Sequence, residues 1–297
     1  MGIALIVLGV VTLLAGLSGD GDVMGQVTRS FVLEPGQQLA IAGRNGAITY
    51  EEWDGHDVQI EATTRASALA RVLWTVLGGG DAVHFAQGSS GVEAAADSRT
   101  SFIGWAGFQV GFHVRVPRGW TGSVQLVNAN GTISAAGLSG DVLLRTTNGP
   151  IAVQGMTGTL QARTSNGTIN LADVHGSVTA VTSNGVVLIS GGTLAGSGRV
   201  QTTNGAIELR AGFEAAASYD LTTTNGAVRA YLPNPDVVLD LTAMNGEIRS
   251  QVPFVVSEEG RERVAGRERE RLEGRIGAGS ALLRIRTSNG PIDVITL

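Results

Sequence analysis

The chain of 297 residues contains no cysteine and no lysine. Without cysteine it forms no disulfide, no cysteine–zinc site, no thiol nucleophile and no lipid-modified cysteine anchor. Its 21 basic residues are therefore all arginine, and its 26 acidic residues bring the formal net charge to −5. Because positive charge is neither in excess nor clustered on the repeats described below, we expect no nucleic-acid partner.

Aromatic residues are also scarce, at 5%, whereas glycine is abundant, with 43 residues. This composition is typical of a chain with many turns and thin layers of aliphatic side chains. The length allows one or two domains and a large core.

Glycine recurs every nine residues between Gly122 and Gly185, and every second one of these glycines follows an asparagine. Two kinds of turn should therefore alternate, which makes the true repeat eighteen residues long. A fixed period of this length indicates a repeat architecture. We expect the asparagines of the Asn-Gly pairs to be structural turn and ladder residues: Asn45, Asn130, Asn148, Asn166, Asn184, Asn204, Asn225, Asn245 and Asn289.

Apolar residues alternate with polar ones between these turns, which predicts short β-strands rather than helices. The side chains expected to point inward after each Asn-Gly are Ile133, Ala135, Leu138, Ile151, Val153, Met156, Ile169, Leu171 and Val174. After each intervening glycine they are Val142, Leu144, Thr146, Leu160, Ala162, Thr164, Val178, Ala180 and Thr182.

Two all-β folds fit arms of this length: an antiparallel meander with Asn-Gly hairpins, and a β-solenoid (parallel β-helix) in which coil stacks on coil. We favour a β-solenoid with coils of about 18–21 residues, because Ile133, Ile151 and Ile169 would then form one column. An open meander would leave one apolar face uncovered.

The N-terminal residues 1–19 carry no charged side chain and include ten Ile, Leu and Val residues between Ile3 and Leu17. Together these ten favour membrane insertion by ~3–6 kcal/mol. We predict an N-terminal membrane anchor, or alternatively a cleaved signal segment, with a linker at 20–26 and an exported β-solenoid domain at 27–297. The protein would then lie in the cell envelope, periplasmic or extracellular. A buried strand is the remaining interpretation of residues 1–19.

Residues 66–120 interrupt the repeat. Leu69, Val72, Leu73, Val76 and Leu77 have helical spacing and precede three glycines at 78–80. Seven of the eleven Phe and Trp residues fall in this segment. We predict an aromatic-rich insertion that caps the stack. The alternative is an apolar contact patch for a membrane or a partner, with these candidate contact residues: Trp74, Phe102, Trp105 and Phe108.

A second interruption, the charged excursion at 256–276, separates Asn245 from Asn289. It holds six arginines and six glutamates between Glu258 and Arg275. Such a balanced run predicts a solvated hairpin or helix that leaves the stack, after which Asn289 closes the series. A docking site for a partner is the alternative.

The blocks TTNGPIAV, TSNGTINL, TSNGVVLI, TTNGAIEL and TSNGPIDV resemble the bacterial "putative adhesin" family, whose members repeat T-S-N-G-x-I along a β-helix. The resemblance covers nearly everything after residue 27. It implies an exported or envelope-anchored β-helix.

Catalytic groups are sparse on the repeats, where Asp141 and Asp173 are the only acids between Gly122 and Gly185. Polysaccharide-cleaving β-helices need paired carboxylates or a base with a metal, and the four histidines show no metal spacing. We expect no catalytic, metal or cofactor site. The predicted function is a non-enzymatic envelope adhesin or surface scaffold, contacting a membrane through residues 1–19 and a glycan or protein at the cell surface. An envelope-sensing binding protein and a polysaccharide-active enzyme are the alternatives.

Overall fold

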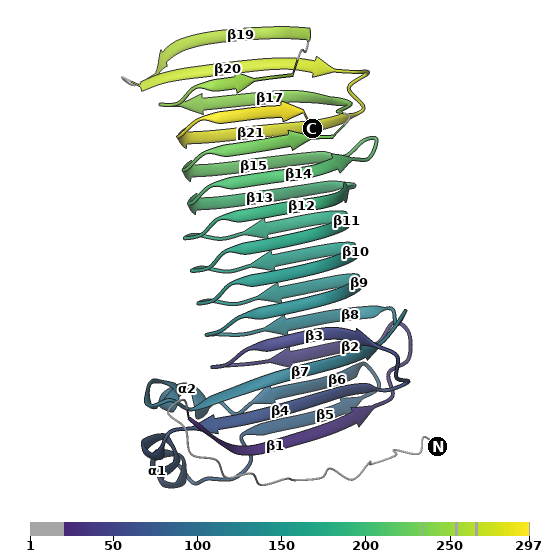
Figure 1. Cartoon of the computed structure of the whole chain (residues 1–297), viewed down its shortest axis with the longest axis vertical. Helices are drawn as coiled ribbons and strands as arrows, with labels where there is room; N and C mark the ends of the chain where they lie inside the picture. Colours follow the sequence, from purple (N-terminus) through teal and green to yellow (C-terminus); the bar gives the residue numbers. More distant parts are fainter. Residues whose placement is uncertain (1–20, 234, 253–254, 265–266, 297) are drawn as a thin grey trace. The chain divides into compact units, whose positions relative to one another are not determined.

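The computed structural model describes residues 21–233, 235–252, 255–264 and 267–296, so the segment predicted as an anchor, 1–19, lies outside the described residues (Figure 1). The described part is mostly β-strand. It divides into two compact units, Met1–Thr146 and Thr147–Leu297.

The first unit holds the helices α1 (Ala68–Val76) and α2 (Thr100–Ile103) and the 3-10 turn η1 (Gly104–Ala106). Its strands are β1 (Asp22–Phe31), β2 (Gln38–Ala42), β3 (Ile48–Trp53), β4 (Val58–Ala66), β5 (Val83–Gly88), β6 (Gly91–Ala96), β7 (Gln109–Pro117), β8 (Gly122–Val127) and β9 (Ile133–Arg145).

The second unit is built from strands alone in the part that the structure describes. They are β10 (Ile151–Arg163), β11 (Ile169–Val181), β12 (Val187–Leu194), β13 (Ser197–Asn204), β14 (Ile207–Phe213), β15 (Ser218–Asn225), β16 (Val228–Leu232), β17 (Val237–Met244), β18 (Ile248–Ser250), β19 (Val255–Val264), β20 (Arg267–Ile276), β21 (Ala281–Asn289) and β22 (Ile292–Thr296).

The strands from β10 to β16 pair in parallel with a step of one repeat. In the β10–β11 pair, Ile151 lies opposite Ile169 and Leu160 opposite Val178. β11 continues the same register onto β12 and β13. This long parallel sheet has the pairing of a β-solenoid, and it excludes the antiparallel meander for these strands.

The predicted inward residues form the core. Every apolar or threonine side chain expected to point inward between Ile133 and Thr182 is buried, and Ile151 and Ile169 have no exposed surface. The two-residue alternation places the intervening side chains on the outer face. The inward and outward assignment made from the sequence is therefore confirmed.

The second kind of turn is broader than the sequence predicts. β10 and β11 continue as strands through Gly158 (φ +123°) and Gly176 (φ +130°), and these two glycines remain paired with each other. Gly155 (φ +71°) and Asp173 (φ +55°) also have positive φ, and the pairing skips them. A residue with positive φ bends the strand locally, and the hydrogen-bonded ladder resumes on both sides of it.

The last strands of the chain are inserted between earlier ones. β21 pairs in parallel with β15 on one side and with β17 on the other, and β22 lies between β16 and β18 in the same way (Figure 1). The expectation that Asn289 closes the asparagine series after Asn245 is therefore wrong. It lies between Asn225 and Asn245.

Charges explain this order on one face of the stack. Arg284 of β21 lies opposite both Asp220 of β15 and Asp240 of β17. If β17 followed β15 directly in the same register, the two aspartates would face each other, and like charges directly opposite are destabilising.

The other face of the stack repeats this arrangement with the signs reversed. Asp293 of β22 lies opposite Arg229 of β16 and Arg249 of β18, at 3.7 and 4.0 Å. The inserted coil therefore places an opposite charge between like charges on both faces.

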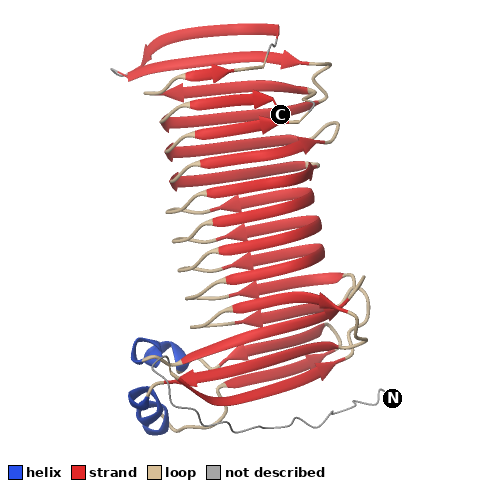
Figure 2. Ribbon diagram, in the orientation of Figure 1, coloured by secondary structure: helices blue, strands red, loops and turns tan. Residues whose placement is uncertain are grey.

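The first unit has the same kind of insertion. β2 pairs in parallel with β6 and β8, and β3 pairs in parallel with β7 and β9. The segment 66–120, predicted as an insertion and cap, thus supplies two strands of the parallel pairing, β6 and β7. Antiparallel strands follow at the edges, with β4 on β7, β1 on β4, and β5 on β6 (Figure 2).

The charged excursion at 256–276 forms a hairpin. β19 and β20 pair antiparallel, and β20 adds antiparallel to β17. Arg271 on β20 lies 3.8 Å from the carboxylate of Asp240 and 3.6 Å from that of Glu258.

Candidate functional site

The asparagines of the Asn-Gly turns form a ladder of side-chain amides in each unit. Each Nδ2 donates to the Oδ1 of the neighbouring coil, at 2.8–3.1 Å. In the second unit the donor–acceptor pairs are Asn166–Asn148, Asn184–Asn166, Asn204–Asn184, Asn225–Asn204, Asn289–Asn225 and Asn245–Asn289. Stacked amides of this kind stabilise parallel strands along the stacking direction.

In the first unit the ladder ends on a helix. Asn130 donates to Asn45 at 2.8 Å, and Asn45 donates in turn to the carbonyl of Thr100 in α2 at 3.0 Å. The amide row of the repeat is thereby joined to the segment 66–120.

Buried threonines lie two residues before six of the ladder asparagines, namely Asn148, Asn166, Asn184, Asn204, Asn225 and Asn289. Each hydroxyl donates to the carbonyl of a turn glycine on another coil, at 2.9–3.2 Å. The pairs are Thr146–Gly131, Thr164–Gly149, Thr182–Gly167, Thr202–Gly185, Thr223–Gly205 and Thr287–Gly226. These bonds satisfy carbonyls in the turn and fix its position on the stack.

Replacing Thr182 by valine should lower the free energy of unfolding by about 1–3 kcal/mol, because the buried hydroxyl that donates to the carbonyl of Gly167 is lost while the side-chain volume stays nearly constant. Chemical denaturation would measure the loss. Thr179→Val on the same strand is the matched control, because Thr179 is only half-buried, and it should change stability by less than about 0.5 kcal/mol. Equal losses in the two variants would contradict a structural role for the threonine row.

Two of the four predicted partner contacts belong to the core of the first unit. Trp74 of α1 and Phe108 are buried, with ring centroids 4.9 Å apart, and the guanidinium of Arg99 lies 4.6 Å from the Trp74 ring centroid. Both rings are therefore unavailable to a partner, which corrects the prediction for Trp74 and Phe108. Phe102 and Trp105 are exposed, by 73% and 77%.

Arg99 joins the two helices around this aromatic pair. It forms an ion pair with Asp97 at 2.9 Å and donates to the carbonyls of Leu77 and Gly79, beyond the end of α1. The hydrogen bonds from Arg99 hold the pKa of Asp97 well below its usual range, and this carboxylate in turn raises the pKa of Arg99.

The outward side of α1 is also apolar. Leu69, Val72 and Val76 share one face at helical spacing and are exposed by 52%, 61% and 77%, whereas Ala70 and Trp74 face inward. We call Leu69, Val72 and Val76, together with Phe102 and Trp105, the outer apolar surface. α1, α2 and η1 lie next to one another (Figures 1 and 2).

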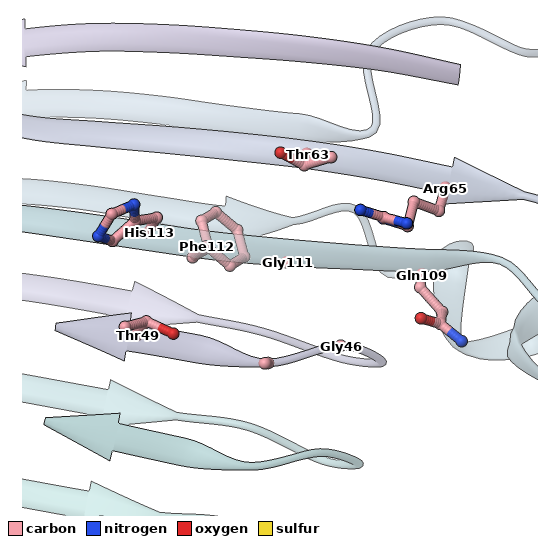
Figure 3. A pocket seen from close by; sticks show the side chains of 9 residues that line it. Gly46, Thr49, Thr63, Arg65, Gln109, Gly111, Phe112 and His113 are labelled. Atoms are coloured by element: carbon pink, nitrogen blue, oxygen red, sulfur yellow. The ribbon is translucent and has the colours of Figure 1, made fainter. Parts of the chain in front are cut away.

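A pocket of about 300 Å3 opens on the outer side of β3, β4 and β7 (Figure 3). Polar side chains of Thr49, Thr63, Arg65, Gln109 and His113 line it, with Gly46, Ala47, Gly111 and Phe112. The Nε2 of His113 lies 2.9 Å from Oε1 of Glu51. These groups can donate and accept hydrogen bonds with a hydroxylated ligand. The sequence did not predict this pocket, because it depends on strands far apart in the chain.

The two acids considered for catalysis lie in different units. Asp173 occupies the bend of β11, 3.1 Å from Nε2 of His175, and both side chains are exposed. Asp141 is an exposed residue of β9. Among the described ranges, no group of three or more His, Asp and Glu side chains is arranged to hold a metal ion.

No helix within the described residues combines the length and the apolar character that a membrane span requires.

Three solved structures to which the chain is similar come from three bacterial species. A "putative adhesin" from Bacteroides fragilis is 11% identical, with a TM-score of 0.47, covering 91% of this chain and 97% of that chain. A "putative adhesin" from Parabacteroides distasonis is 13% identical, with a TM-score of 0.49, covering 90% and 96%. A "putative cell adhesion protein" from Clostridium sporogenes is 10% identical, with a TM-score of 0.26, covering 91% and 99%.

No curated protein matches the chain in sequence. The model of one protein family, Toastrack DUF4097, matches residues 52–295, which is most of the chain. This match confirms the family relationship expected from the repeated T-x-N-G blocks. The chain belongs to the Toastrack DUF4097 family.

Proposed function

We propose that the protein is a non-enzymatic interaction module of the cell envelope, acting as an adhesin or a surface scaffold. The observation that carries this proposal is the regular outer face of the second unit. The parallel register aligns outward side chains of successive coils in straight rows, such as Gln161, Thr179 and Arg199. The spacing along a row is about 4.8 Å, the distance between neighbouring strands. Extended regular faces of this kind are the binding surfaces of solenoid proteins.

The buried threonines and the amide ladder support this role, because they hold each turn at a fixed place on its neighbour. A partner that spans several coils then meets a surface that is already ordered, and it loses less conformational entropy on binding. The partner we propose is a cell-surface glycan or protein, and residues 1–19 would hold the module at a membrane.

Binding of the full chain to immobilised envelope glycans and matrix proteins tests this function. We expect retention on at least one ligand class, and a loss of at least about tenfold in affinity when Gln161, Thr179 and Arg199 are all replaced by alanine, because the row then loses its polar groups. Arg65→Ala with His113→Ala, in the pocket of the first unit, is the control and should leave retention unchanged.

Two results would contradict this function. One is binding that the row variant does not weaken. The other is cleavage of a cell-wall or plant polysaccharide that is lost in Asp173→Asn, since that would make the protein an enzyme.

A further inference from the structure

The outer apolar surface is the feature of the first unit that neither the core nor the proposed binding rows account for. It gathers three aliphatic side chains of α1 and two aromatic rings of the α2–η1 segment, all more than half exposed. Contiguous exposed apolar side chains usually mark a contact with a partner or a membrane. Tryptophan and phenylalanine beside aliphatic side chains are typical of helices that lie at a lipid–water interface.

The chain enters the described structure beside α1 and the end of η1, the segments that carry this surface. Oδ2 of Asp22 lies 3.0 Å from Nη2 of Arg71 on α1. A Cβ added at Gly21 would lie 3.4 Å from the backbone of Ala66 and 3.6 Å from the carbonyl of Gly107. Ala66 lies just before the N-cap of α1, and Gly107 is the C-cap of η1. The described chain therefore begins at the base of both helical segments.

The connection between the apolar N-terminal segment and this surface is short. Four residues separate Leu17 from Asp22, and the five steps from one Cα to the next span at most ~18 Å when fully extended. If residues 3–17 lie in a bilayer, Asp22 and the side of α1 that carries Arg71 are held close to the surface of that bilayer.

Arg71 within α1 and Arg99 at the N-cap of α2 each pair with a carboxylate of the protein. Arg71 pairs with Asp22, and Arg99 pairs with Asp97. Neither arginine needs an anionic lipid as its partner, so the chemistry of this surface fits a bilayer without net charge.

We propose that the outer apolar surface inserts into the interface of the same membrane that residues 1–19 enter, with Phe102 and Trp105 at the level of the lipid headgroups. This inference rests on the proposed anchoring by residues 1–19. The contact would give the first unit a second attachment to the membrane and so fix its orientation on it.

The absence of cysteine allows a clean labelling experiment. Val72→Cys carries an environment-sensitive fluorophore, and Val32→Cys is the matched control. The two valines are exposed by 61% and 65%, and Val32 follows the far end of β1, ~30 Å from Asp22 along the ten-residue strand. The full chain is reconstituted in phosphatidylcholine vesicles, with or without lipids that carry a quenching nitroxide. We expect at least about twofold quenching at position 72 and none at position 32.

Other quenching results would contradict the membrane contact, and each would have a different explanation. If the chain floats with the vesicles but the labels at positions 72 and 32 are quenched to the same extent, the proposed membrane contact of α1 is wrong. The proposed anchoring by residues 1–19 is then retained. If the label at 72 is shielded but nitroxide lipids do not quench it, residues 1–19 or a second copy cover the surface, and the proposal fails. Leu69→Cys repeats the measurement in case Val72→Cys unfolds.

The anchor is tested separately with Leu8→Asp and Val11→Asp combined. We expect the labelled double variant to remain in solution instead of floating with the vesicles, because charged groups are strongly disfavoured within a bilayer. Flotation of the double variant to the same extent as the parent chain would show that residues 1–19 are not the anchor.

Discussion

Replacing Ile169 by alanine is expected to lower the free energy of unfolding by about 2–5 kcal/mol, the usual cost of a large-to-small change in a core. The side chain has no exposed surface and lies in one column with Ile151 and Val187, its partners on the neighbouring coils. Both neighbours are held by strand pairing, so the cavity cannot close by moving one coil. Urea denaturation followed by circular dichroism measures the change as a shift of the midpoint.

Arg163→Ala is the matched control for this prediction, because Arg163 is an exposed residue on the outer face of β10. We expect it to change the free energy of unfolding by less than about 0.5 kcal/mol. Equal losses in Ile169→Ala and Arg163→Ala would show that the assignment of inner and outer faces is wrong.

Replacing Gly167 by alanine is expected to cost about 3 kcal/mol, at the upper end of the range for overpacking. The new Cβ would overlap the carbonyl oxygen of Gly149 on the coil beside it. That coil cannot move away freely, because the N–H of Gly149 donates to the backbone carbonyl of Asn166 at 3.0 Å. The N–H of Gly167 likewise donates to the backbone carbonyl of Asn184 at 3.1 Å. The substitution therefore forces two coils apart at a point where their backbones are bonded.

Gly212→Ala on β14 is the control for steric contact, because the nearest atom to its added Cβ is 3.9 Å away. It should leave stability unchanged or raise it slightly, since alanine restricts the unfolded chain. Thermal unfolding of both variants would compare them directly. A Gly167→Ala protein as stable as Gly212→Ala would mean that close approach of the turns is not what requires glycine there.

The sequence predicts the inner and outer residues of the repeat well, because one physical rule determines them. Alternation along a strand puts Ile151, Val153 and their equivalents on one face, and a period of eighteen residues stacks them. The additional bend at Gly155 and Asp173 was not predicted, because neither residue belongs to the nine-residue glycine spacing, which indicates only the nearby Gly158 and Gly176.

The order of the coils could not be predicted from the Asn-Gly turns, because every block fits every position in the stack equally well. The order of the coils is favoured instead by residues that differ from one coil to the next. Arg284 between Asp220 and Asp240, and Asp293 between Arg229 and Arg249, favour the observed order over the sequential one. These charges could be used to predict the order only if the register of the paired strands were already known.

For the helical segment, the sequence does not predict which side of α1 packs against the core. α1 has apolar residues on both sides, so periodicity predicts a helix over 68–76 but does not decide which side packs. The core contact is decided by Trp74 meeting Phe108, more than thirty positions later in the chain. The outward position of Leu69, Val72 and Val76 follows from that contact, and only the structure reveals it.

The inserted coils also affect how the protein is made and degraded. In the second unit, the coil at 237–250 meets its parallel neighbour only when residues 281–296 have left the ribosome, because those residues form β21 and β22. In the first unit, the earliest coil, 38–53, becomes an internal layer once 91–145 has folded around it. A protease that digests β22 and β21 would therefore have to extract strands that lie between two parallel neighbours, whereas the ends of a sequentially wound solenoid can unravel one coil at a time.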